Sequence, residues 1–232
     1  MSDETQDRLL LTVTTPLGKD RLLFKSLQGE EQIGGLFYFQ VEMLSRWKDF
    51  NFDDLVSKRL TVKIEFAPNH VRYINGVITR FVQSGTFVHP NTQAQMTRYH
   101  AEIRPWLWQL TLTRNCRIFQ HLSVPQIIQK VFDDFNLTDY RFSLLYPYEK
   151  RIYCVQYEET AFDFVSRLME DEGIFYFFEH TEKKHTLVIA DDLSAHQPCP
   201  AISTARFLAV SNQTQPENAV IACQFLQMMP PL

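Results

Sequence analysis

The sequence predicts an α+β protein that consists mainly of antiparallel β-sheet, with a barrel-like domain over residues 1–105 and a mixed α+β domain over residues 106–195. Two observations support this fold class. In the N-terminal half, apolar and polar side chains alternate in several successive runs, which is typical of half-buried antiparallel strands. After Pro105 the apolar spacing changes to that of helices, and each helical stripe follows a residue that can cap a helix.

Four runs with strand character occupy the N-terminal domain, at Leu36–Met43, Leu60–Phe66, Val71–Val82 and Tyr99–Ile103. A glycine inside the third run, Gly76, predicts a β-bulge or a close approach of another part of the chain. Successive antiparallel strands with one polar face must close on themselves or pack against a second layer. We therefore expect a barrel or a sandwich.

The mixed domain begins with a helix signal. Ser123 and Gln126 have the spacing of a capping box, and Pro125 suits the first turn of a helix. An apolar stripe with helical spacing follows, formed by Ile127, Ile128, Val131, Phe132 and Phe135. The segment therefore predicts a helix, after which two strand-like runs follow, at Arg141–Leu145 and Arg151–Tyr157.

The next segment predicts a capped helix and a β-hairpin. Thr160 can cap the helix together with the acidic Asp163, and Gly173 can end it in the left-handed conformation. The apolar residues of this helix spread around more than one face, which predicts burial on two sides: Phe162, Phe164, Val165, Leu168 and Met169. A strand at Ile174–Phe178 and its hairpin partner at His185–Ala190 follow, joined by a polar turn.

Composition and charge exclude several classes of protein. The 232 residues carry a formal net charge of −4 and are 45% hydrophobic, with 19 Phe. This composition supports a sizeable buried core, and the weak negative charge offers no general attraction to nucleic acid or to an anionic membrane. No apolar run approaches the roughly 18–20 residues that span a bilayer. The acidic, polar N-terminus differs from a secretory signal peptide, so we expect synthesis in the cytoplasm.

The sequence carries no motif for a cofactor or a reactive thiol pair. The four cysteines, Cys116, Cys154, Cys199 and Cys223, show neither Cys-x-x-Cys pairing nor metal-ligand spacing, so we expect free thiols. A nucleophile elbow, a phosphate-binding loop and a His-Glu-x-x-His motif are missing, and seven glycines leave no Gly-rich loop. We expect no cofactor.

Two acidic clusters could supply paired carboxylates for hydrolysis: Asp191–Asp192 and Glu170–Glu172, which includes Asp171. Neither cluster has an obvious partner group nearby in the sequence. We therefore interpret the first as the acidic end of a strand and the second as a solvated helix face.

Two histidines flank the predicted hairpin turn. His180 and His185 could face each other and hold a metal ion with Glu179 or Glu182 as further ligands. Exposed polar turns of this composition are common. We therefore expect a surface hairpin without a metal.

Trp106 and Trp108 stand at alternating positions and could form a stacking platform for a sugar or a base. Packing in the core or between domains is the better interpretation. The arginines nearby are too scattered to form a nucleic-acid-binding stripe: Arg98, Arg104, Arg114 and Arg117. The sequence therefore offers no convincing active site, and we do not expect an enzyme.

Several sequence blocks occur in an order that matches a known family. The most specific are Cys-Val-Gln-Tyr at Cys154–Tyr157 and Phe-Asp-Phe-Val-Ser-Arg-Leu-Met-Glu-Asp-Glu-Gly-Ile-Phe-Tyr-Phe at Phe162–Phe177. The others are Gly29–Val41, Asn75–Ile78, Arg104–Leu110, Arg117–Gln120 and Ser123–Ile128. On these blocks the chain resembles VgrG, the valine-glycine repeat proteins at the tip of type VI secretion machines. The resemblance covers roughly residues 8–195, and residues 196–232 match less clearly.

The resemblance implies a fold like the phage baseplate hub and a structural function. In the VgrG family, three copies form a ring of barrel-like domains with near six-fold symmetry, which fits a hexameric Hcp tube. We expect the ring surface at Leu36–Met43 and Leu60–Phe66, where a proline at Lys63 would disrupt docking. The implied partners are further copies of the chain, the Hcp tube, baseplate proteins, effectors, and a separate spike or PAAR chain. The protein would leave the cell through the type VI apparatus.

Family members usually continue into an OB-fold and a β-helical spike, for which 232 residues leave no room. We expect residues 196–232 to form the start of a second barrel-like domain or a tail. Two other functions stay open: an effector hydrolase that uses Asp191 or the His180/His185 pair, and a carbohydrate- or receptor-binding module that uses Trp106 and Trp108.

Overall fold

The computed structural model describes residues 5–7, 9–67, 70–88 and 93–197, together with the backbone of 206–207 and 219–220. The chain divides into two compact units, Met1–Ala195 and His196–Leu232. In the second unit, β12 (Arg206–Phe207) pairs in parallel with β13 (Ala219–Val220). The expectation for residues 196–232 falls mostly outside the described residues, as do Cys199 and Cys223. The proposed boundary near residue 105 lies inside the first unit and stays a prediction.

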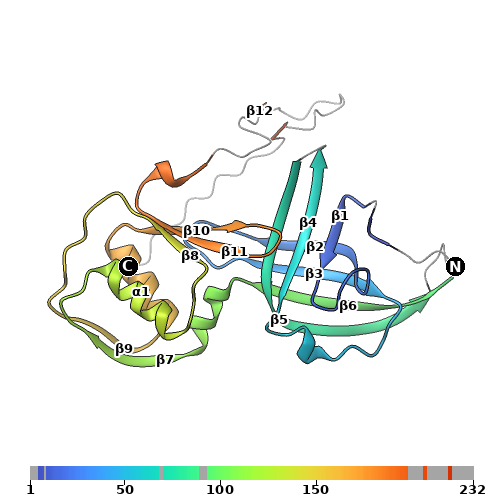
Figure 1. The fold of residues 1–232 in the computed structure, drawn as a ribbon, viewed down its shortest axis with the longest axis horizontal. Coiled ribbons are helices and arrows are strands. Elements are labelled where there is room, and N and C mark those ends of the chain that lie inside the picture. Colours follow the sequence, from blue (N-terminus) through green and yellow to red (C-terminus); the bar gives the residue numbers. More distant parts are fainter. Residues whose placement is uncertain are drawn as a thin grey trace. The chain divides into compact units, whose positions relative to one another are not determined.

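A six-stranded antiparallel sheet forms the N-terminal part of the first unit (Figure 1). Its strands are β1 (Leu11–Thr14), β2 (Leu23–Glu30), β3 (Tyr38–Ser45), β4 (Arg59–Ala67), β5 (His70–Val88) and β6 (Gln95–Arg104). Their order in the sheet is β1-β4-β5-β6-β3-β2, and a short 3₁₀ helix, η1 (Phe52–Asp54), precedes β4. The predicted succession of antiparallel strands is confirmed, whereas β1 and β2 had not been predicted.

The side chain of Gln6 joins the two edge strands of this sheet. Its Oε1 accepts the N–H of Val13 in β1 at 2.9 Å and the N–H of Phe24 in β2 at 3.0 Å. Its Nε2 donates to the carbonyl of Val13 at 3.2 Å and to that of Leu22 at 3.3 Å. One buried amide thus supplies donors and acceptors to both edges, as a neighbouring strand would.

The strands expected to form a ring surface have no free edge. β3 lies between β2 and β6, and β4 lies between β1 and β5. The Glu65 N–H donates to the Leu10 carbonyl, so the alternation of the ladder directs the Lys63 N–H toward β1 as well. A proline at Lys63 would therefore break the pairing of β1 with β4, and the expected loss of docking stays a prediction.

Gly76 allows a close approach of strands, as one of the two sequence-based alternatives predicted. A Cβ atom at this position would lie 3.0 Å from the Cβ of Ile103 and 3.2 Å from the ring of Phe37. The pairing of β4 with β5 is regular here, because its only register shift lies between Glu65 and Ala67. The glycine therefore serves packing and does not form a bulge.

The remainder of the first unit contains two helices, two small sheets and two 3₁₀ helices (Figure 1). Its elements are η2 (Trp106–Leu112), β7 (Arg114–Phe119), α1 (Val124–Asp134), β8 (Tyr140–Ser143), β9 (Cys154–Thr160), α2 (Ala161–Asp171), β10 (Phe175–His180), β11 (His185–Ala190) and η3 (Leu193–Ala195). β10 and β11 form the predicted antiparallel hairpin, and β8 joins β11 in parallel. β7 and β9 form a separate antiparallel ribbon.

Both helices begin where the sequence predicts, and α2 also ends there. The Ser123 N–H donates to Oε1 of Gln126 at 3.0 Å, and Oγ1 of Thr160 accepts the N–H of Asp163 at 3.0 Å. Gly173 follows α2 with a φ of +69°, which is the left-handed conformation expected at a helix C-terminus. The capping predictions are confirmed.

Burial of α2 differs from the prediction. Its buried side chains form a single stripe, made of Ala161, Phe164, Val165, Leu168 and Met169. Phe162 on the flank is half-buried, and Asp163, Arg167 and Glu170 are exposed. The expectation of two-sided burial is wrong, because spacings of three and four residues place all five buried side chains on one face.

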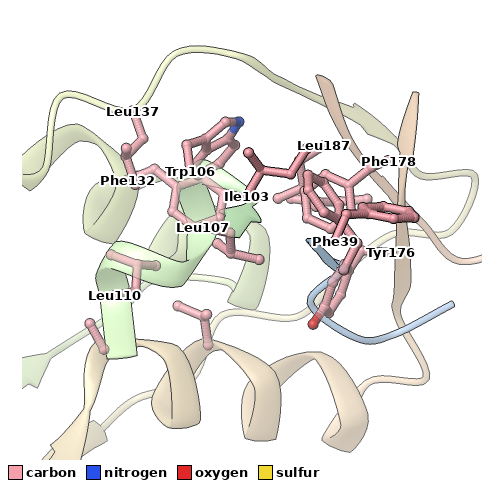
Figure 2. Close-up of a cluster of buried hydrophobic side chains, with 14 of the residues drawn as sticks. Phe39, Ile103, Trp106, Leu107, Leu110, Phe132, Leu137, Tyr176, Phe178 and Leu187 are labelled. Atoms are coloured by element: carbon pink, nitrogen blue, oxygen red, sulfur yellow. The ribbon is translucent and has the colours of Figure 1, made fainter. Parts of the chain in front are cut away.

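One hydrophobic core runs through the whole first unit. Figure 2 shows labelled side chains from Phe39 and Phe178 through Ile103 to Trp106 and Phe132. These five residues come from β3, β10, β6, η2 and α1, so the six-stranded sheet and the helices are packed around common side chains. None of the helices in the described part of the chain is long and apolar enough to cross a membrane.

Candidate functional site

The two histidines of the β10–β11 hairpin meet the six-stranded sheet at a buried joint. His180 and His185 are register partners in the hairpin, and their ring centroids are 6.0 Å apart. His185 is completely buried, and only 7% of the His180 side chain is exposed. The expectation of an exposed polar turn is therefore wrong for these two rings, although Glu182 and Lys183 in the turn are exposed.

His185 uses both ring nitrogens. Its Nε2 accepts the backbone N–H of Trp106 at 2.9 Å, and its Nδ1 lies 2.9 Å from Oδ1 of Asn75 in β5. Since the Trp106 N–H can only donate, Nε2 is the acceptor and Nδ1 carries the proton. Burial, assisted by the charges of His180 and Arg59, lowers the pKa of His185 to about 3, so the ring is neutral.

His180 connects the hairpin to the loop before β3. Its Nε2 lies 2.9 Å from Oε1 of Glu31, and its Nδ1 lies 3.1 Å from both the N and the O of Asn75. Burial would raise the pKa of Glu31, but the hydrogen bond and charge of His180, together with Arg72, outweigh it and lower the pKa. The Glu31 carboxylate is therefore ionised at neutral pH and accepts the Nε2 proton.

Polar contacts of Asn75 and Thr61 continue the joint. Nδ2 of Asn75 donates to Oγ1 of Thr61 at 2.7 Å, and the Thr61 hydroxyl donates to the carbonyl of Glu182 at 2.8 Å. Asn75 thereby contacts both histidines and the neighbouring strand β4. In the sequence, Asn75 is marked only as a polar residue between Ile74 and Gly76 within a predicted strand.

An ion-pair cluster lies beside the joint. Asp139 accepts hydrogen bonds from Arg59 and, at 2.9 Å, from Lys184, and Arg59 also donates to the Lys183 carbonyl at 3.2 Å. Burial would raise the pKa of Asp139, but Lys184 and Arg59 outweigh it and lower the pKa. These partly exposed pairs contribute little energy each, about 0–1 kcal/mol, and mainly fix the geometry.

This arrangement does not suit metal binding. Both nitrogens of His185 are occupied, Glu31 is paired with His180 and Arg72, and Glu179 is paired with Arg141 at 2.7 Å. Across the described ranges, no cluster of three or more His, Cys, Asp or Glu side chains could hold a metal ion.

The acidic clusters bond to the protein itself. Asp191 accepts the backbone N–H groups of Leu145 at 2.9 Å and Tyr146 at 3.0 Å, and the hydroxyl of Tyr148 at 2.9 Å. Burial would raise the pKa of Asp191, but these hydrogen bonds lower it. Asp192 accepts the Ser194 N–H at 2.8 Å. The carboxylates thus hold the loop after β8 and the start of η3.

The second acidic cluster is divided by a salt bridge. Arg151 donates to Glu172 at 2.8 Å and to Asp171 at 3.4 Å, while Glu170 is exposed. Neither acidic cluster leaves a pair of carboxylates free to share a substrate.

The tryptophans do not form a common platform. Trp106 is buried and packs edge-to-face on Phe132, with ring centroids 5.5 Å apart. Trp108 is half-buried, and the Arg104 guanidinium lies 5.4 Å from its ring and 4.5 Å from that of Tyr38. The packing interpretation is correct for Trp106, and its burial excludes a platform shared with Trp108.

The two cysteines in the described residues are free thiols, and two of the arginines form ion pairs. Cys116 is a free, exposed thiol and Cys154 a free, buried one. Arg98 pairs with Glu42 at 2.9 Å, and Arg117 pairs with Asp134 at 2.6 Å, so these two arginines belong to separate local networks.

A cleft of about 510 Å³ lies next to the joint. Residues from β4, β5, η2 and the loop after α1 line it, among them Arg59, Thr79, Trp108 and Asp139. Arg59 and Asp139 neutralise each other in its wall. The sequence could not predict this cleft, because its lining comes from segments far apart in the chain.

Comparison with known proteins identifies relatives of this fold. The chain matches the family described as phage tail baseplate hub (GPD) over residues 30–227. It is similar to the type VI secretion system spike protein VgrG1a of Pseudomonas aeruginosa, with 40% identity over 188 residues, 81% of this chain and 28% of the relative. It is also similar to the actin cross-linking toxin VgrG1 of Vibrio cholerae, with 31% identity over 184 residues, 75% of this chain and 16% of the toxin.

A solved structure shows the same fold. The E. coli c3393 protein, a component of the type VI secretion system, aligns with a TM-score of 0.68 and 24% identity, covering 86% of this chain and 52% of that chain. The hub-like α+β fold and the resemblance to VgrG spike proteins are thereby confirmed. This chain spans 28% of the length of VgrG1a and 16% of the length of the Vibrio cholerae toxin. Over residues 30–227, the chain belongs to the phage tail baseplate hub (GPD) family.

Proposed function

We propose that this chain is the hub-like part of a type VI secretion spike and that it adapts the hexameric Hcp tube to the spike as one of three copies. The observation that carries the proposal is the family match over residues 30–227, together with 40% identity to a type VI spike protein. Three copies that each contribute two similar barrels would match a six-fold tube.

The residues considered for catalysis form hydrogen bonds and ion pairs within the protein, which supports a structural function. Asp191 holds a loop, His185 holds a joint between elements, and Arg151 neutralises Asp171 and Glu172. A hydrolase needs such groups to face a substrate. Because these groups are bonded within the protein, we propose that the chain is not an enzyme.

The β7–β9 ribbon offers a surface for assembly. Its outer face carries Ile118, 62% exposed, opposite the half-buried Val155, with Tyr157, 70% exposed, next to them. Among the described residues, β7 and β9 pair with no other strand, so their outer edges lack a strand partner, although Arg167 donates to the Val155 carbonyl of β9 at 3.4 Å. Exposed apolar side chains beside open edges are typical of protein contact surfaces.

The proposal also covers the route and the other partners of the protein. It is made in the cytoplasm and leaves the cell with the type VI apparatus, as expected for a spike component. Baseplate proteins, effectors and a separate spike chain would bind to surfaces other than the tube-facing ring.

Native mass measurement with and without Hcp tests the proposal. Because this chain matches 28% of VgrG1a, we would also exchange it for the matching region of that protein and measure trimer formation and Hcp binding. We expect the exchanged protein to assemble and to bind Hcp. An exchanged protein that folds but neither trimerises nor binds Hcp, or a pure chain that hydrolyses peptidoglycan, nucleotides or lipids, would contradict the proposal.

Two matched variants test the assembly surface. Ile118→Asp places a charge on the apolar face and should weaken assembly at least about tenfold, which corresponds to ~1.4 kcal/mol. Asn115→Asp adds the same charge to the same exposed strand without removing apolar surface and should leave assembly nearly unchanged. Equal binding by both variants would place the contact surface elsewhere.

A further inference from the structure

We propose that the two histidines form a protonation-sensitive joint: neutral His185 holds the hairpin tip against the six-stranded sheet and η2, and a proton on its Nε2 releases the tip. This inference does not depend on the proposed function. It concerns residues 179–186, the segment of the hairpin nearest to the sheet.

The hydrogen bond between His185 and Trp106 requires an unprotonated Nε2. Nε2 of His185 is an acceptor for the Trp106 N–H at 2.9 Å. A proton on Nε2 would place two donors against each other at that distance, and the Trp106 N–H would lose its partner in a buried site. Burying an unpaired polar group is costly, so the charged ring and the closed joint exclude each other.

The charges around His185 also disfavour a proton on its ring. The groups that face it are His180 on β10, Arg59 on β4, Asp139 in the loop before β8, and the neutral amide of Asn75 on β5. His180 and Arg59 oppose a positive charge on His185, and Asp139 alone favours it. Asp139 is already bound to Arg59 and Lys184, so it does not rescue the protonated ring. The lowered pKa of His185 agrees with this environment.

His180 differs from His185 in what its ring nitrogens face. Its Nε2 faces the Glu31 carboxylate at 2.9 Å, and its Nδ1 lies 3.1 Å from both the N–H and the carbonyl of Asn75, whereas Nε2 of His185 faces only the Trp106 N–H. Arg72 is the other charge bound to Glu31. The ring centroid of His180 lies 6.0 Å from that of His185, and its charge is one of the causes that lower the pKa of His185. His185 is therefore the residue that opens the joint.

The size of the effect follows from linkage. In an open tip His185 would titrate near its ordinary pKa of about 6.5, whereas in the closed joint its pKa is about 3. Lowering the pH from about 7 to about 5 should therefore raise the open population on the order of 20-fold. Over this pH range most carboxylates stay ionised, so a change in the open population indicates protonation of a histidine.

Hydrogen exchange of the full chain tests the proposal. We expect the amides of Trp106 and Asn75, which donate to His185 and His180 across the joint, to lose protection by on the order of 20-fold between about pH 7 and pH 5, after correction for the intrinsic pH dependence of exchange. Amides in α1 should show no such loss and serve as the internal reference.

Two variants assign the effect. His185→Leu cannot titrate, so its tip should be more open at both pH values, with a ratio close to one between them. His180→Gln keeps a donor for Glu31 and should retain most of the pH dependence of the normal chain. A normal chain without the change, or a His185→Leu chain that keeps it, would overturn the proposal. If His185→Leu does not fold, NMR of the imidazole nitrogens decides: a charged His185 in a still protected tip would also overturn it.

Discussion

At the scale of single residues, buried polar side chains determine how the strands of the first unit are held together. Gln6 bonds to both edges of the six-stranded sheet, and Asn75 bonds to both histidines of the joint. Their donors and acceptors are satisfied by groups from other segments, so each residue specifies a contact that apolar packing alone would not fix.

Gln6→Ala should lower the free energy of unfolding by about 2–4 kcal/mol, because it leaves the N–H groups of Val13 and Phe24 without their acceptor. Urea denaturation followed by circular dichroism measures this loss. Gln28→Ala, at an exposed position of β2, is the matched control and should change stability by less than about 0.5 kcal/mol. Equal losses would show that Gln6 does not bridge the edges.

At the scale of secondary-structure elements, local signals predicted more than distant ones. α1, α2 and the β10–β11 hairpin begin and end near their predicted positions, because capping side chains and Gly173 act within a few residues. β1 was missed because it has only 4 residues, and β2 because a register shift between Phe24 and Ser26 interrupts its alternation. The order of the strands in the six-stranded sheet could not be predicted from the sequence, because the pairing of each strand depends on contacts with the whole sheet.

The single buried face of α2 gives a test at this scale. Leu168→Ala should cost about 2–5 kcal/mol of stability, because Leu168 is completely buried in the core. Glu170→Ala, at an exposed position of the same helix, should change stability by less than about 0.5 kcal/mol. Thermal or urea unfolding compares the two, and similar costs would be incompatible with a one-sided helix.

At the scale of the whole molecule, the site is a property of the tertiary structure. The sequence indicated His180 and His185 as a pair, and the hairpin places them opposite each other. It could not indicate Glu31 and Asn75, because these residues lie 149 and 105 positions away from His180 along the chain. It also could not show that the pair is buried, since the surrounding turn is polar.

The stability of the first unit should fall on acidification in two steps. His185 has a lowered pKa in the fold, so the unfolded state binds its proton first and stability falls as the pH drops from about 6.5 toward 3. Glu31, Asp139 and Asp191 also have lowered pKa values, so the stability that they contribute is present above about pH 4 and is lost below it. Melting temperature against pH measures both steps, and a His185→Leu variant should lack the first.

The continuous core described above has a mechanical consequence. Ile103, Trp106 and Phe132 belong to one close-packed cluster that connects the six-stranded sheet with the helices. Close-packed interiors compress very little, so a push on the sheet would reach α1 through side chains already in contact. Two domains joined only by a linker would first bend at that linker, and part of an applied displacement would be lost there. This unit should instead transmit an axial force as one stiff body.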